Sequence, residues 1–198
     1  RFHFYEGHEI RDVVSPIYLF KEMGIERLLI TNASGGINKT YSPGDIVAIR
    51  DIINLGFRNP LRGPNEEKFG VRFPDMSSVV DLEWLARLRE RLYRDGHELK
   101  EGTYIWTLGP SYESPSEIKS FEFLGADMVG MSTVPELIAA NHCRMKTLAL
   151  SCVTNMASGI LKEKLSHDDV VRTANRIRHR FSDIVGKALE VLKEIDDE

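Results

Sequence analysis

The feature that most constrains the fold of this chain is the alternation of strand-like and helix-like segments along its 198 residues. Five apolar, β-rich runs bounded by Gly, Pro, Ser or Asn lie at residues 27–32, 44–54, 102–110, 126–132 and 146–155. Segments with helical periodicity lie between and after them. Such alternation is typical of a largely parallel sheet covered by helices on both faces. The sequence therefore predicts the α/β class, with a largely parallel or mixed, twisted central sheet flanked by helices.

Each predicted helix begins at a pair of residues that can cap it, a Ser or Thr followed three positions later by an acidic residue. The pairs are Ser78 and Asp81, Ser114 and Glu117, Thr133 and Glu136, and Ser166 and Asp169. The last pair opens the longest helix, in which apolar residues recur at spacings of three and four. They are Val170, Ala174, Ile177, Phe181, Ile184, Ala188, Leu192 and Ile195. This stripe indicates a core-facing helix and not a cofactor-binding segment.

Composition and charge narrow the class of protein. With 42% hydrophobic and 28% charged residues the chain can build one good core, so we predict a single domain over residues 1–198. The net charge of −4 gives no electrostatic reason to bind nucleic acid or an anionic membrane, and no apolar run has the length of a bilayer span. Cys143 and Cys152 lack a zinc-like or redox spacing, which favours core positions in a reducing cytoplasm.

The ends of four predicted strands share a polar or glycine-rich character. These ends are residues 31–36 ("TNASGG"), 109–114 ("GPSYES"), 129–132 ("VGMS") and 153–155 ("VTN"). Any one of them, taken alone, is more simply a turn. In open α/β sheets, however, ligands bind beyond the carboxyl ends of the strands. Four such ends in one chain therefore predict a binding site at this edge of the sheet.

Seven motifs, in this order, carry a resemblance to a known family. They are "RFHFYEG", "TNASGG", "NPLRGPNEEKFGVRFPDMS", "GPSYES", "GADMVGMSTVPE", "SCVTN" and "LSHDDV". The set covers essentially the whole chain and resembles the trimeric purine nucleoside phosphorylases of the 6-oxopurine-specific type. The resemblance implies reversible phosphorolysis of inosine or guanosine, and of their deoxy forms, to free base and (deoxy)ribose 1-phosphate. It also implies a homotrimer with inorganic phosphate as co-substrate, without a cofactor or metal.

The resemblance assigns four residues to phosphate binding. They are Arg1, His3, the backbone N–H of Ala33 and the hydroxyl of Ser132, and His3 is also expected to take part in catalysis. If the first segment is extended, Arg1 and His3 project to one face, where a guanidinium fork can bind two oxygens. Glycines beside Ala33 allow a close approach of the backbone to an anion.

The sugar is expected to contact Tyr5, Met131 and His167. His167 directly follows the predicted cap of the longest helix, and the positive end of a helix favours a neutral imidazole. Phe73 matches the residue that a neighbouring subunit places over the sugar in this family. A trimer would therefore complete the site.

The base is expected to bind between Glu113 and Asn155, which are also expected to act in catalysis, with Tyr112 offering its ring. Val129 and Thr154 are expected to be further substrate contacts. A 6-oxopurine presents an N1–H donor, which Glu113 can accept, and an O6 acceptor, to which the Asn155 amide can donate. Adenine reverses this edge and would leave both side chains badly paired. The related methylthioadenosine phosphorylases carry aspartate at the Asn155 position.

Two alternatives stay open: a methylthioadenosine phosphorylase, and a non-catalytic fragment that binds purines or nucleosides. The chain begins at Arg1 without an initiator Met, and the family's N-terminal segment, with its glycine-serine phosphate loop, is not in the sequence. We therefore predict an N-terminal truncation and slow turnover by this chain alone. The motifs leave open the preference among inosine, guanosine and xanthosine.

Overall fold

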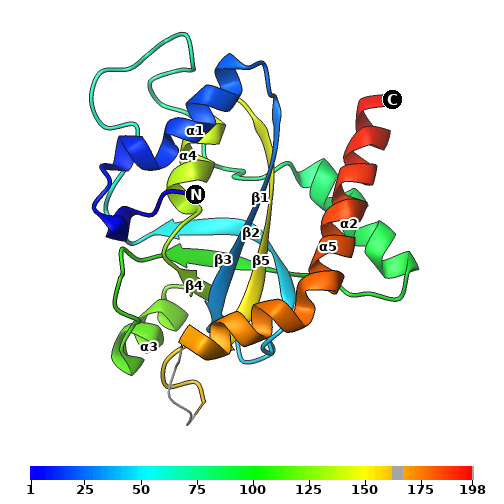
Figure 1. Ribbon diagram of the computed structural model, residues 1–198. Helices are drawn as coiled ribbons and strands as arrows, with labels where there is room; N and C mark the ends of the chain where they lie inside the picture. The colour runs from blue at the N-terminus through cyan, green and yellow to red at the C-terminus, as the bar shows by residue number, and fades with distance from the viewer. Residues whose placement is uncertain (162–166, 198) are drawn as a thin grey trace.

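The computed structural model describes residues 1–161 and 167–197, and a closed five-stranded barrel forms its centre (Figure 1). The strands are β1 (Arg27–Gly36), β2 (Ile46–Asn54), β3 (Lys100–Trp106), β4 (Met128–Gly130) and β5 (Lys146–Met156). Hydrogen bonds join them in the order β1-β4-β3-β2-β5. All five predicted strands are present. β1 continues past residue 32 to Gly36, so the glycine-rich "TNASGG" motif is itself part of the strand.

The sheet is mixed, as predicted. β1 pairs with β5, β2 with β3 and β3 with β4 in parallel, whereas β2 with β5 and β1 with β4 are antiparallel. The antiparallel pairs join the parallel group of β2, β3 and β4 to the parallel pair of β1 and β5 and so close the barrel, which the sequence did not predict. The alternating pattern reports which segments are strands, and it carries no information about which strand edges meet.

Five α-helices and one short 3₁₀ turn surround the barrel in the described residues. They are η1 (Phe4–Glu6), α1 (Ile10–Glu22), α2 (Leu82–Arg94), α3 (Pro115–Phe123), α4 (Val134–His142) and α5 (His167–Asp197). α1 is not among the predicted helices. Its N-cap residue, Glu9, makes no side-chain cap hydrogen bond, and Pro16 lies inside the helix, so the sequence lacks the usual start signal and contains a helix-breaking residue.

The predicted caps are borne out in part. At α3, Ser114 and Glu117 form the reciprocal pair, with the Glu117 carboxylate 2.7 Å from the Ser114 N–H. At α2 the prediction that Ser78 caps the helix is wrong. Asp81 is the N-cap, and its side chain accepts two backbone N–H groups of the first turn, each at 3.0 Å. The Ser78 hydroxyl instead donates to a backbone carbonyl two residues further on. Ser166, the predicted cap of α5, lies outside the described residues.

Helices α2 and α5 pack together on one side of the barrel, and α1 packs against α4 on another (Figure 1). The indole N–H of Trp84 on α2 donates to the carbonyl of Ala188 on α5 at 2.8 Å. The predicted apolar stripe of α5 places Ile177 and Ile184 in the core beside Ala188. Ala174 belongs to the same predicted stripe but is exposed. The first buried side chain in the described part of α5 is that of Ile177.

The segment between β2 and α2 is irregular from residue 55 to residue 81, as predicted for residues 54–78. Gly70 allows this segment to approach α4 closely, because a Cβ at this position would lie only 1.9 Å from the carbonyl oxygen of His142. None of the described helices is long and apolar enough to cross a membrane.

Candidate active site

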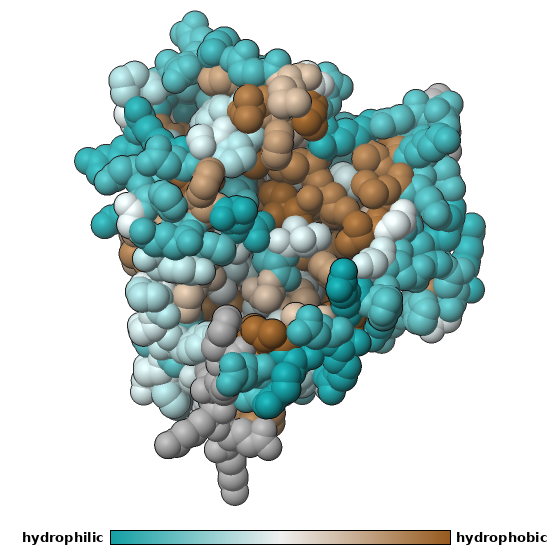
Figure 2. Space-filling view, viewed as in Figure 1, coloured by the Kyte–Doolittle hydropathy of each residue, from teal (hydrophilic) through white to brown (hydrophobic). Residues whose placement is uncertain are grey.

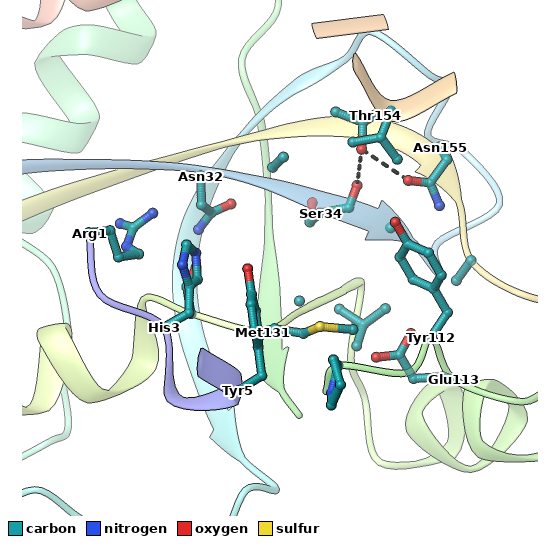
Figure 3. A pocket seen from close by; sticks show the side chains of 18 residues that line it. Arg1, His3, Tyr5, Asn32, Ser34, Tyr112, Glu113, Met131, Thr154 and Asn155 are labelled. Atoms are coloured by element: carbon teal, nitrogen blue, oxygen red, sulfur yellow. Dashed lines mark hydrogen bonds between the residues drawn. The ribbon is translucent and has the colours of Figure 1, made fainter. Parts of the chain in front are cut away.

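The four predicted strand ends line a single cavity of about 480 Å³ (Figure 3). Residues from the ends of β1, β4 and β5 contribute to its walls, together with Pro110, Tyr112 and Glu113 after β3. The N-terminal residues Arg1, His3 and Tyr5 also line it. Figure 3 shows Arg1 and His3 at one end of the cavity and Glu113 and Asn155 at the other. The site therefore has two distinct polar ends.

At the first end, the Arg1 guanidinium is held by a carboxylate. Its Nε lies 2.9 and 3.0 Å from the two carboxylate oxygens of Glu136, and its Nη1 donates to the Thr31 carbonyl at 3.0 Å. Glu136 is only 9% exposed and also accepts the backbone N–H of Thr133 at 2.8 Å. The fork expected to bind phosphate is therefore already fixed in orientation along its Nε edge.

His3, two residues after Arg1, has extended backbone, and the chain then turns through η1. Its ring stacks on Tyr5 with centroids 4.8 Å apart and planes 17° from parallel. The backbone N–H of His3 donates to the Glu6 carboxylate at 2.8 Å. This hydrogen bond is the main cause of the lowered pKa of the Glu6 carboxyl. This turn holds two predicted ligand residues, His3 and Tyr5, side by side.

Ser132 belongs to a hydroxyl cluster at the same end. Its Oγ lies 3.0 Å from Thr133 Oγ1, which also accepts the side-chain amide of Asn32 at 2.8 Å. Thr133 is fully buried and has a φ of 73°, a left-handed conformation that is costly for a β-branched residue. The cluster and Glu136 together hold this strained turn.

At the second end of the cavity, a β-bulge in β5 determines how the Asn155 side chain is oriented. Ser34 pairs with Val153, but the next residue, Gly35, pairs with Asn155, so Thr154 is an extra residue in β5. The Thr154 hydroxyl lies 2.9 Å from Asn155 Oδ1 and 3.3 Å from the carbonyl oxygen of Ser34. Because the hydroxyl holds Oδ1, the amide nitrogen is the group left for the cavity, although it also lies 3.1 Å from its neighbour's carbonyl.

Glu113 is fixed in a similar way by Thr107, whose hydroxyl donates to it at 2.8 Å. Tyr112, beside it in Figure 3, is 45% exposed, and burial followed by the charge of Glu113 raises the pKa of its phenol. The carboxylate and the Asn155 amide thus present an acceptor and a donor at one end of the cavity.

The cavity includes most of the predicted site residues. Arg1, His3, Tyr5, Ala33, Tyr112, Glu113, Val129, Met131, Ser132, Thr154 and Asn155 all line it. Phe73 does not. It is 87% exposed and lines a separate depression with residues of the irregular segment. The side chain of His167, at the start of α5, lies outside the described part of the chain.

Sequence reasoning missed seven lining residues. They are Asn32, Ser34, Gly35, Pro110, Gly130, Ala157 and Val170. All but Ala157 lie within motifs already singled out, so the motifs included them without assigning a role in the site. Val170 was predicted to face the core and instead lines the cavity, because α5 begins beside the site.

Comparison with known proteins identifies the family. The sequence model of the family described as the phosphorylase superfamily matches residues 4–190 of this chain. Purine nucleoside phosphorylase 1 of Bacillus subtilis is 46% identical over 186 residues, which cover 93% of this chain and 68% of the relative. The rat enzyme, purine nucleoside phosphorylase of Rattus norvegicus, is 42% identical over 197 residues, or 96% of this chain and 68% of the relative.

The chain belongs to the purine nucleoside phosphorylases of the phosphorylase superfamily. Solved structures agree. Schistosoma mansoni purine nucleoside phosphorylase in complex with inosine superposes with a TM-score of 0.91 at 35% identity, covering 96% of this chain and 70% of that chain. The same enzyme has also been solved in complex with adenosine. In this member of the family, no cluster of potential metal ligands is present among the described residues.

The geometry around Glu136 predicts a structural cost for its removal. Glu136→Ala leaves Nε of Arg1 and the buried N–H of Thr133 without their acceptor. We expect the free energy of unfolding, measured by urea denaturation, to fall by about 1–3 kcal/mol. Glu122→Ala is the matched control, because Glu122 pairs with Lys39 on the surface and such pairs contribute about 0.2–1 kcal/mol. Equal losses in the two variants would contradict this reading of the site.

Proposed function

We propose that this protein is a purine nucleoside phosphorylase that acts reversibly on 6-oxopurine ribonucleosides and deoxyribonucleosides. The observation that carries the proposal is the single cavity with an arginine, a histidine and a hydroxyl at one end and a carboxylate and an amide at the other. The first set suits a phosphate, and the second suits the hydrogen-bonding edge of a purine. The relatives named above carry this activity in their names.

The reaction breaks the bond between the sugar C1′ and the purine N9 and forms a bond between C1′ and a phosphate oxygen. The bonding electron pair leaves with the purine, which becomes negatively charged before it is protonated, while the sugar becomes oxocarbenium-like. A catalyst must stabilise both charges in place. Asn155 is proposed to donate to the purine, and Arg1, His3, Ser132 and the Ala33 N–H to hold the phosphate that approaches the opposite side of C1′.

Preference for 6-oxopurines follows from how the two base-end side chains are fixed. The Thr154 hydroxyl holds Asn155 Oδ1, so Nδ2 remains to donate to O6 or N7. Thr107 holds one oxygen of Glu113, whose other oxygen can accept N1–H. Adenine offers the reverse pattern. The Schistosoma mansoni enzyme has been solved with both inosine and adenosine, so the preference is to be sought in turnover and not in binding alone.

Three parts of the proposal rest on the resemblance and on chemistry. His167 and Tyr5 are proposed to contact the sugar, with Val129 and Met131 supplying apolar contact. No cofactor is needed, because phosphate itself is the second substrate. A cytoplasmic location is proposed because Cys143 and Cys152 are both free and buried.

The function is tested by following hypoxanthine release from inosine with and without inorganic phosphate. We expect release that depends on phosphate and yields ribose 1-phosphate in equal amount. Guanosine should react as well. Binding of hypoxanthine without any phosphate-dependent release would instead support the non-catalytic alternative. A preference for methylthioadenosine over inosine would support the other alternative.

The base end predicts a change of substrate preference. Asn155→Asp keeps the size of the side chain and the Thr154 contact but replaces the donating amide by an acceptor. We expect the barrier for inosine phosphorolysis to rise by about 1–3 kcal/mol, the range for an unpaired buried polar group, with a smaller effect on adenosine. The readout is the ratio of kcat/KM for the two nucleosides. Asn141→Asp, at an asparagine on α4 that donates to the Ser78 carbonyl, is the control and should leave the ratio unchanged.

Phe73 is proposed to pack over the sugar site of an adjacent subunit in a cyclic homotrimer. Its ring is 87% exposed and lies outside the cavity of its own chain, in an irregular segment beside Arg72. Exposure alone does not assign a partner, because single exposed apolar rings are common. The proposal rests on the resemblance, in which a neighbouring subunit places the residue at this position over the sugar. Heterologous contacts that close after three copies would supply one such ring to each site.

Phe73→Ala is therefore expected to raise KM for inosine about tenfold, the effect of losing contact area worth about 1.4 kcal/mol. The solution mass of the unmodified protein should be about three times 22.5 kDa. Phe123→Ala removes a ring that is 93% exposed on α3 and should change neither quantity. An active monomer with unchanged KM in the Phe73 variant would exclude the shared site.

A further inference from the structure

Tyr104 on β3 is a fully buried tyrosine that the mechanism above does not use. Its side chain is 0% exposed, and its hydroxyl has no hydrogen-bond partner within the described residues. Buried hydroxyls are nearly always partnered, since an unpaired one loses its bonds to water without replacement. The Ser132 hydroxyl and backbone N–H lie close enough to lower the pKa of the phenol, yet neither forms a well-aligned hydrogen bond with it in this structure. A small shift of Ser132 when a ligand binds can complete such a bond.

The phenol lies directly against the strand end that leads to Ser132. A Cβ on Gly130 would lie 2.2 Å from Tyr104 Oη, so glycine at this position allows the hydroxyl to reach the backbone of β4. The nearby hydroxyl and N–H of Ser132 and the charge of Arg1 act on the phenol, opposing the larger effect of burial. Tyr104 does not line the cavity itself. It can therefore act on a ligand only through a residue that does line the cavity, such as Ser132.

The hydrogen bonds of the hydroxyl cluster leave Ser132 Oγ able to accept a hydrogen bond from a second donor. Asn32 donates to Thr133 Oγ1, which leaves the Thr133 hydrogen available for Ser132 Oγ, 3.0 Å away. A serine hydroxyl has one hydrogen and two acceptor positions. When Ser132 gives its hydrogen to an anion in the cavity, one acceptor position can receive Thr133 and the other remains for a second donor.

We propose that Tyr104 is a positioning residue for the phosphate end of the site, whose O–H donates to Ser132 Oγ when the Ser132 hydroxyl donates to bound phosphate. The inference rests on the proposed function, because it takes phosphate as the anion. Successive hydrogen bonds in a buried chain polarise one another, so the second donor strengthens the bond from Ser132 to the anion. Burial raises the pKa of Tyr104 to about 12, which keeps the phenol protonated and able to donate at neutral pH.

The test compares two buried tyrosines that have opposite hydrogen-bonding states. Tyr104→Phe removes a hydroxyl without a partner, whereas Tyr41→Phe removes one that donates to the carbonyl of Glu101 at 2.9 Å. For each variant, isothermal titration gives the Kd of inorganic phosphate and of hypoxanthine, and urea denaturation gives the free energy of unfolding. Both substitutions conserve the ring and its packing.

For Tyr104→Phe we expect the Kd of phosphate to rise about tenfold, the effect of one hydrogen bond to a chain ending on a charge, with the Kd of hypoxanthine within twofold. Its stability without ligand should be unchanged or higher. For Tyr41→Phe we expect lower stability and an unchanged Kd of phosphate. An unchanged Kd of phosphate in Tyr104→Phe overturns the proposal, and so does an equal weakening of phosphate and hypoxanthine.

The outcome separates this inference from the proposed function. If the unmodified protein binds phosphate but releases no hypoxanthine from inosine, the proposed function fails while the comparison of phosphate affinities still decides the role of Tyr104. If it releases hypoxanthine and Tyr104→Phe binds phosphate normally, only the inference fails. If the unmodified protein binds no phosphate, both are overturned.

Discussion

The parallel pairing of β1 with β5 is the interaction on which the rest of the structure depends. It runs from Arg27 opposite Lys146 to Gly36 opposite Met156, and the buried hydroxyls of Ser34 and Ser151 contact each other across it at 2.7 Å. Because the strands are parallel, the glycine-rich end of β1 and the end of β5 reach the same edge of the barrel. The groups proposed to bind phosphate and those proposed to bind the base can then share one cavity, which is the geometry that a transfer between two substrates requires.

The two ends of that cavity are rigid for different physical reasons. At the end proposed to bind the base, the extra residue Thr154 in β5 supplies a hydroxyl that contacts Asn155. The β-bulge therefore fixes the orientation of the Asn155 amide. At the phosphate end, a nearly buried carboxylate, Glu136, fixes Arg1 and the strained backbone of Thr133. A negative charge beside an anion site is unfavourable on its own. At the proposed phosphate site this charge is offset, because the Arg1 guanidinium and the Thr133 N–H neutralise and orient the Glu136 carboxylate.

Much of this was readable from the sequence because it depends on local chemistry. The strands, the Ser114 cap and the convergence of the strand ends follow from period, capping residues and the properties of α/β sheets. The closure of the barrel, the bulge at Thr154 and the contact of Tyr104 with Gly130 depend on how strands pair across the chain, which no local pattern encodes. α1 was missed because it lacks a side-chain cap and contains Pro16. The proposed role of Phe73 depends on an adjacent subunit, and thus on contacts of an assembly, which no local pattern encodes.

The most direct test of the central claim is a crystal structure of the protein with hypoxanthine and phosphate bound together. The account predicts the purine between Glu113 and Asn155, with N1 facing the carboxylate and O6 or N7 facing Nδ2. It places the phosphate within hydrogen-bonding distance of Arg1, the Ala33 N–H and Ser132. A base bound at the Arg1 end, or a phosphate bound outside this cavity, would contradict it.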